Sequence, residues 1–139
     1  MQRGNRRRLV SAGLLAGATV LLAACAHHRS ADDEDINAYP ANYKTEILEG
    51  MHAYLNDPTG IRDAAISEPM LKSTGTGEAT HYVVCVRFNP KQSATVYAGV
   101  REVAAVFLVG RFDRFIDTPK QQCADASYAP FPELQKLSR

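Results

Sequence analysis

Residues 42–55 carry hydrophobic side chains at the spacing of one face of an α-helix. The stripe consists of Tyr43, Ile47, Leu48, Met51, Tyr54 and Leu55. Asn42 stands at the expected N-cap position, and Pro58 ends the pattern because proline disfavours a helical residue before it. The residues that fall outside the stripe are Lys44, Glu46, Glu49 and Gly50. The pattern predicts an amphipathic helix that packs through one face.

The hydrophobic pattern after this helix predicts four strands, in residues 61–71, 81–88, 100–109 and 112–116. In the second strand one face would carry Tyr82, Val84, Val86 and Phe88, and the other Val83, Cys85 and Arg87. Residues 100–109 are apolar on both faces, which is typical of a central strand. Pro69 favours a place at the sheet edge for the first strand, since proline cannot donate a backbone hydrogen bond.

Gly110-Arg111 predicts a tight turn before the last strand, because glycine accepts the positive φ that hairpins require. In that strand Phe112 and Arg114 would face opposite to Asp113 and Phe115. We therefore expect an α+β domain in residues 41–139, with one N-terminal amphipathic helix packed on a roughly four-stranded antiparallel meander sheet. Because one helix covers only one face of a sheet, residues 128–134 are expected to cover part of the other.

Residues 1–24 have the pattern of a cleaved export signal. Arginines at positions 3, 6, 7 and 8 precede an apolar run, residues 9–22, that is shorter than the roughly 20 residues of a membrane-spanning helix. The alternatives are a retained transmembrane helix and an ordinary secretory signal cut near Ala23 or Ala26. The run 6–10, Arg-Arg-Arg-Leu-Val, also fits a twin-arginine signal. Residues 25–40 are polar and acidic, which predicts a flexible tether.

The segment Leu22-Ala23-Ala24-Cys25 resembles the lipobox of bacterial lipoprotein precursors. The resemblance implies that Cys25 becomes the first residue of the mature protein and carries several acyl chains, which together make anchoring stable. Ala26 occupies the sorting position and implies the outer membrane, with the domain facing the periplasm. Segments 39–44, 56–64, 82–89 and 131–134 resemble small uncharacterised envelope lipoproteins of alphaproteobacteria, and this second resemblance implies no activity.

Three cysteines are present, and assigning Cys25 to lipid leaves Cys85 and Cys123. A remaining pair in an exported protein favours a disulfide, the alternative being two separate buried thiols. Removing residues 1–24 takes away four of the 16 basic side chains and none of the 15 acidic ones, so the mature chain has a net charge of about −3. This charge argues against nucleic acid as a partner.

Known catalytic motifs are missing from the sequence, which contains no His-Glu-x-x-His, Gly-x-Ser-x-Gly, Cys-x-x-Cys or phosphate-binding loop. We therefore expect no enzyme activity, no cofactor and no metal. His52 and His81 are the histidines of the folded part, and either would be the general base if the protein were a hydrolase. Asp113 and Asp117 would share a strand face but lie roughly 13 Å apart, too far for a catalytic pair.

The leading hypothesis is a non-enzymatic adaptor, a lipid-anchored envelope protein whose domain binds another envelope protein or polymer. A cationic patch would suit an anionic polymer or an acidic partner, with a solvated outer face as the alternative, and its members would be Arg87, Arg101, Arg111 and Arg114. The second hypothesis is a small-ligand-binding domain with a cleft lined by Tyr43, Tyr54 and Tyr82. The third is a hydrolase that uses His52 or His81.

Overall fold

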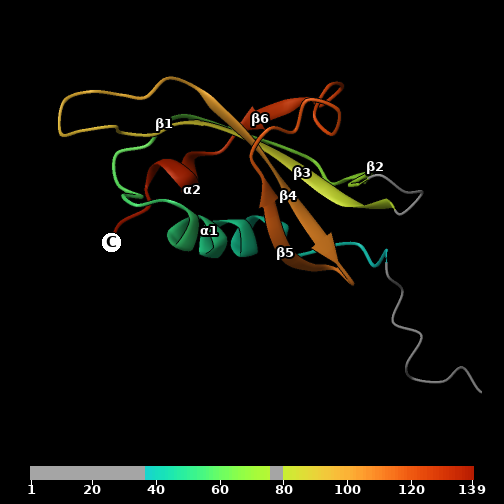
Figure 1. Cartoon of the computed structure of the whole chain (residues 1–139). Coiled ribbons are helices and arrows are strands. Elements are labelled where there is room, and N and C mark those ends of the chain that lie inside the picture. Colours follow the sequence, from blue (N-terminus) through green and yellow to red (C-terminus); the bar gives the residue numbers. More distant parts are fainter. Residues whose placement is uncertain (1–36, 76–79) are drawn as a thin grey trace, which may run out of the picture. The chain divides into compact units, whose positions relative to one another are not determined.

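The computed structural model describes residues 37–75 and 80–139, all within one compact unit (Figure 1). The predicted signal, the lipobox with Cys25 and most of the predicted tether lie outside the described residues. The fold is α+β, with one N-terminal helix packed on a six-stranded antiparallel open sheet. Within the described ranges no helix combines the length and apolar character needed to cross a membrane.

Helix α1 spans Tyr43–Tyr54, as the hydrophobic stripe predicts, and it buries Tyr43, Ile47 and Met51. Asn42 is the N-cap residue, and its carbonyl accepts the Glu46 N–H at 3.1 Å. Its side chain makes no capping hydrogen bond. Asn42 therefore marks the start of the helix, as predicted, but does not cap it through its side chain.

The sheet follows the order β5-β4-β3-β1-β6, and β2 pairs with β3 beside this path. Its strands are β1 (Arg62–Ser67), β2 (Met70–Ser73), β3 (Thr80–Asn89), β4 (Arg101–Leu108), β5 (Arg111–Ile116) and β6 (Tyr128–Pro130). The prediction of one strand over residues 61–71 is wrong, because the chain breaks at Glu68-Pro69 and resumes as β2, which also pairs with β3. The break fits proline's missing N–H.

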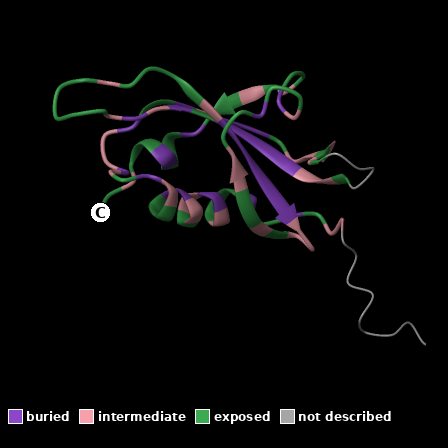
Figure 2. Ribbon diagram, viewed as in Figure 1, coloured by how far each residue is buried: buried purple, intermediate pink, exposed green. Residues whose placement is uncertain are grey.

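Two hydrophobic clusters pack on opposite faces of the sheet, and the alternation predicted for β3 is confirmed. Val84, Val86 and Phe88 belong to the main core with α1, whereas Val83 and Cys85 belong to a smaller cluster. Strand β4 is buried on both sides, as predicted, and contributes to both clusters. The buried central parts of β3 and β4 are visible in Figure 2.

The C-terminal segment meets the predicted face only through Tyr128, which packs against the smaller cluster, and the rest of it lies on the α1 side. Strand β6 pairs with β1, and the short helix α2 (Pro132–Gln135) follows it on the α1 side of the sheet, with Phe131 and Leu134 in the main core (Figure 1). The Phe131 N–H continues this pairing by donating to the Ala64 carbonyl at 2.8 Å. Residues 117–127, hereafter the strap, instead contribute Cys123 and Ala126 to the smaller cluster on the other face.

The β4–β5 hairpin departs from the prediction in two details. Its turn is Val109-Gly110, both with positive φ (52° and 72°), one residue earlier than predicted. A register shift leaves Asp113 as an extra residue, since Val106 pairs with Arg114 but Phe107 pairs with Phe112. The bulge turns Phe112 and Phe115 to the same side, with ring centroids 4.7 Å apart, so their predicted opposite facing is wrong.

Two residues assigned outside the stripe of α1 in fact join the helix to β5. Glu46 accepts the Phe112 N–H at 2.6 Å through Oε2, and its Oε1 lies 3.2 Å from Nε of Arg111. Gly50 faces the ring of Phe112, and a Cβ at this position would stand 2.9 Å from that ring. The absence of a side chain at Gly50 therefore lets α1 approach β5 closely.

Candidate functional site

An open groove of about 690 Å³ lies at the C-terminal end of α1. One wall is formed by Tyr54 and the residues that follow it, through Asp57. The other side is formed by the β3–β4 loop and the neighbouring ends of β4 and β5, including Pro90, Lys91, Arg101 and Asp117. The groove thus gathers three segments that are far apart in the sequence.

The β3–β4 loop, residues 90–100 and hereafter the arm, is held by its own hydrogen bonds and extends beyond the sheet (Figure 1). Gln92 donates its N–H to the Val96 carbonyl at 2.8 Å, and Ala98 donates to the Pro90 carbonyl at 3.0 Å. The Tyr97 hydroxyl donates to the Gly60 carbonyl at 3.0 Å, which fixes the arm to the turn after α1. This hydrogen bond connects the arm to the turn that follows the other wall of the groove.

Lys91 takes its position from the shape of that turn. Gly60 has a φ of 66°, and a Cβ there would stand 2.6 Å from Cε of Lys91. The bare backbone of Gly60 leaves room for the lysine stem. Asp57 holds the turn by accepting the Thr59 N–H at 3.0 Å and the Thr59 hydroxyl at 2.7 Å. Those hydrogen bonds hold the pKa of Asp57 below its usual value.

Tyr54 and Asp117 form a hydrogen-bonded pair in the groove, with the Tyr54 hydroxyl as donor. Burial raises the pKa of Tyr54 to about 12, and the hydrogen bond to Asp117 acts in the same direction. The positive charge of Arg101, which also lines the groove, lowers the pKa of Tyr54 and offsets part of this rise. At neutral pH the tyrosine is therefore a neutral donor and Asp117 already has a partner.

The carboxylates of the groove have hydrogen-bonding partners, whereas its cations form no ion pairs with described residues. Asp57 is bonded to Thr59 and lies 3.4 Å from Arg139, and Asp117 is bonded to Tyr54. Lys91 and Arg101, by contrast, form no ion pair with any carboxylate in residues 37–75 or 80–139. The groove therefore presents two cations with open hydrogen-bonding capacity, beside two carboxylates that already accept hydrogen bonds.

The predicted arginine patch is mostly neutralised by nearby carboxylates. Arg87 lies 2.8 Å from Glu102 and also stacks on Tyr128, Arg111 pairs with Glu46, and Arg114 pairs with Asp113. Of the four arginines only Arg101 lacks such a partner among the described residues. The one arginine of the predicted patch without a carboxylate partner therefore lies at the groove.

Of the three tyrosines of the predicted cleft, Tyr54 alone lines the groove. The Tyr43 hydroxyl donates to Glu68 at 3.3 Å, and burial together with Glu68 raises the pKa of Tyr43 to about 12. Tyr82 packs against the main core and meets the edge of the Tyr39 ring, with centroids 5.3 Å apart.

Neither histidine lines the groove. His52 is exposed on α1, and His81 lies in β3 opposite Lys72 with its Nδ1 buried. Asp113 pairs with Arg114, whereas Asp117 pairs with Tyr54. In the part of the chain that the structure describes, no group of three or more histidine, cysteine or acidic side chains is placed to hold a metal.

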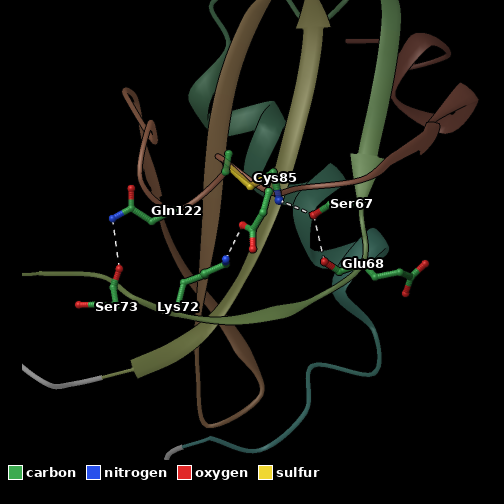
Figure 3. Close-up of polar contacts among 8 residues, drawn as sticks. Ser67, Glu68, Lys72, Ser73, Cys85 and Gln122 are labelled. Carbon is green, nitrogen blue, oxygen red and sulfur yellow. Dashed lines mark hydrogen bonds and ion pairs between the residues drawn. A yellow bond between two sulfur atoms is a disulfide. The ribbon is translucent and has the colours of Figure 1, made fainter.

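The predicted disulfide is confirmed, with Cys85 and Cys123 bridged across a Cα–Cα distance of 5.9 Å (Figure 3). It holds the strap against β3, and polar contacts tie the strap to β2 as well. Gln122 donates to the Ser73 carbonyl at 3.2 Å, and Lys72 pairs with Asp125. The buried Ser67 hydroxyl accepts the Cys85 N–H at 2.9 Å, where β1 leaves the ladder.

Comparisons with protein-family models, curated proteins and solved structures find no match for this chain. The site must therefore be interpreted from its own geometry.

Sequence reasoning singled out Tyr54, Arg101 and Asp117, each for a separate reason, and it missed the roles of Asp57 and Lys91. The turn residues Asp57-Pro58-Thr59-Gly60 and the Pro90-Lys91 loop start were its only signals for them.

Proposed function

We propose that this protein is a lipid-anchored envelope protein that binds a small polar ligand in the groove. The observation that supports ligand binding best is the groove itself, because its volume of about 690 Å³ falls in the range of small-molecule sites. Two of its side chains, Lys91 and Arg101, form no ion pair with a described carboxylate. This geometry favours the ligand-binding hypothesis over the adaptor hypothesis.

The anchor is supported by the cysteines. The bridge uses Cys85 and Cys123, so Cys25 is the one cysteine of the chain that it leaves for lipid. A disulfide also suits an oxidising compartment such as the periplasm. With Ala26 after the lipidated residue, we place the protein at the outer membrane. The mass of the N-terminal peptide from purified membranes tests this proposal: it should begin at Cys25 with acyl chains, and an unmodified Cys25 would refute it.

The ligand-binding proposal is tested by filling the groove. Ala98 lines the groove, whereas Ala94 lies on the same arm outside it. We expect protein isolated from its own membranes to carry a small molecule in native mass spectrometry. The Ala98→Trp variant should lose that molecule and the matched Ala94→Trp variant should keep it. Equal retention by both variants would refute the groove as the binding site.

The adaptor hypothesis remains the second candidate because the arm exposes apolar side chains. Val96 and Val100 are 50% and 63% exposed, and side chains of this kind are common in protein interfaces. In-cell crosslinking followed by mass spectrometry should then recover one protein partner reproducibly, and a Cys25→Ser control should lose it. Recovery of no protein partner would favour the small ligand.

A further inference from the structure

The charges in the groove determine which ligand chemistry suits it. Both carboxylates have partners: Asp57 accepts two hydrogen bonds from Thr59, and Asp117 accepts one from Tyr54. Lys91 and Arg101 have no carboxylate partner in the described part of the chain. A ligand group that binds here gains most by accepting hydrogen bonds from these cations.

The two cations are placed by other contacts and do not depend on each other. Lys91 lies along the bare backbone of Gly60, where a Cβ would stand only 2.6 Å from its Cε. Arg101 is the first residue of β4, in register with Phe88 of β3. The backbone around Lys91 is held by its bridge to Tyr97 and by the hydrogen bonds of the arm, and that of Arg101 by its pairing with β3, so a ligand would meet segments that are already held in place.

The apolar part of the lining lies beside these cations. Leu55, Pro90 and Tyr54 line the same groove; Leu55 and Pro90 are largely buried, and the Tyr54 hydroxyl is engaged by Asp117. A ligand with a small apolar body would bury that body against these residues.

We infer that the groove binds a small molecule through an anionic group, a carboxylate or a phosphate, held by Lys91 and Arg101, with the apolar body of the ligand against Tyr54, Leu55 and Pro90. This inference rests on the proposed ligand-binding function and names its ligand class. It also makes Arg101 the one arginine of the predicted patch with a role in binding.

Three probes that share one ring test the inference: benzoate, phenyl phosphate and neutral benzyl alcohol. Each is titrated into the ¹⁵N-labelled full chain carrying Cys25→Ser, and the backbone signals of Lys91 and Arg101 are followed by NMR. We expect benzoate or phenyl phosphate to bind at least about tenfold more tightly than benzyl alcohol, since charge-assisted hydrogen bonds are the stronger ones. The two anions distinguish a carboxylate ligand from a phosphate ligand.

Matched variants separate a specific site from general electrostatics. Arg101→Gln should weaken binding of the anion about tenfold, and Arg101→Lys should restore part of it because the charge is kept. Lys120→Gln removes the same charge from an exposed residue outside the groove and should leave binding unchanged. Arg101 is itself exposed, so its substitution should not unfold the domain, which the dispersion of the NMR signals checks directly.

The outcomes distinguish the two proposals. If benzyl alcohol binds in the groove as tightly as the anions, or if Arg101→Gln and Lys120→Gln have equal effects, the anionic ligand is refuted and ligand binding stands. If none of the three probes shifts the groove signals, the anionic-ligand inference is refuted, whereas the proposed groove function is decided separately by the Ala98→Trp and Ala94→Trp comparison.

Discussion

Replacing Cys85 and Cys123 with alanine is expected to lower the free energy of unfolding by about 4 kcal/mol. The bridge joins residues that are 38 positions apart, and a crosslink of that span removes about this much conformational free energy from the unfolded chain. Small domains have a total stability of only about 5–15 kcal/mol, so the loss is a large share. The strap's remaining hydrogen bond and ion pair to β2 are worth about 1 kcal/mol or less each and cannot replace the bridge.

Urea unfolding followed by circular dichroism measures this loss. The reference is the chain carrying Cys25→Ser, and the variant adds the two alanine substitutions. The reduced reference protein is the control, because it lacks the crosslink but keeps both buried sulfur atoms. We expect most of the loss to appear on reduction alone. A total loss below about 1 kcal/mol would refute the reasoning that the bridge acts by restricting the unfolded chain.

Three further predictions concern α1. Glu46→Ala should lower the free energy of unfolding by about 1–3 kcal/mol because the Phe112 N–H loses its acceptor. Arg111→Ala should lower it by less than about 1 kcal/mol because this arginine side chain is 80% exposed, and equal losses in urea unfolding would contradict this. Gly50→Ala should reduce stability by about 1 kcal/mol, since its Cβ would stand 2.9 Å from the Phe112 ring and the overlap outweighs the helix preference of alanine; a thermal melt showing stabilisation would contradict it. Tyr54→Phe should reduce the loss of stability at alkaline pH. The pKa of Tyr54 is about 12 in the folded protein and about 10 in the unfolded chain, so the stability that this raised pKa contributes is complete below pH about 10 and is lost as the pH rises to about 12. Unfolding curves with the same pH dependence in both proteins across that range would refute this.

The helix and the long strands could be predicted because their signals are local. The stripe of α1 and the alternation of β3 follow directly from the periods of helix and strand. Strand β6 has only three residues and ends at Pro130, so it carries no period to detect. The bulge at Asp113 depends on register with β4, which no pattern within β5 encodes. Together with the break at Pro69 that separates β1 from β2, these two features explain the errors in strand number and in the facing of Phe112.

The groove could be predicted only in part, because it exists through tertiary contacts. Tyr54 is recognisable as the last aromatic residue of the helix stripe, but its partner Asp117 lies 63 positions away. Lys91 gains its place from Gly60, whose positive φ becomes apparent only in the folded turn. The sequence indicates which residues carry charge or aromatic rings, but not which residues they contact. Ion pairs such as Arg87–Glu102 depend on the pairing of β3 with β4.

The central claim is that the groove is the working site of a lipid-anchored domain. The most direct measurement is in-cell photocrosslinking with a photoreactive amino acid placed at Gln92, which lines the groove, or at Gln121 on the strap, which does not. The mass of the crosslinked peptides is then compared with that of the same variants carrying Arg101→Gln. We expect a small-molecule adduct at Gln92 that is absent at Gln121 and reduced by Arg101→Gln. The same adducts at both positions, or none at Gln92, would contradict it.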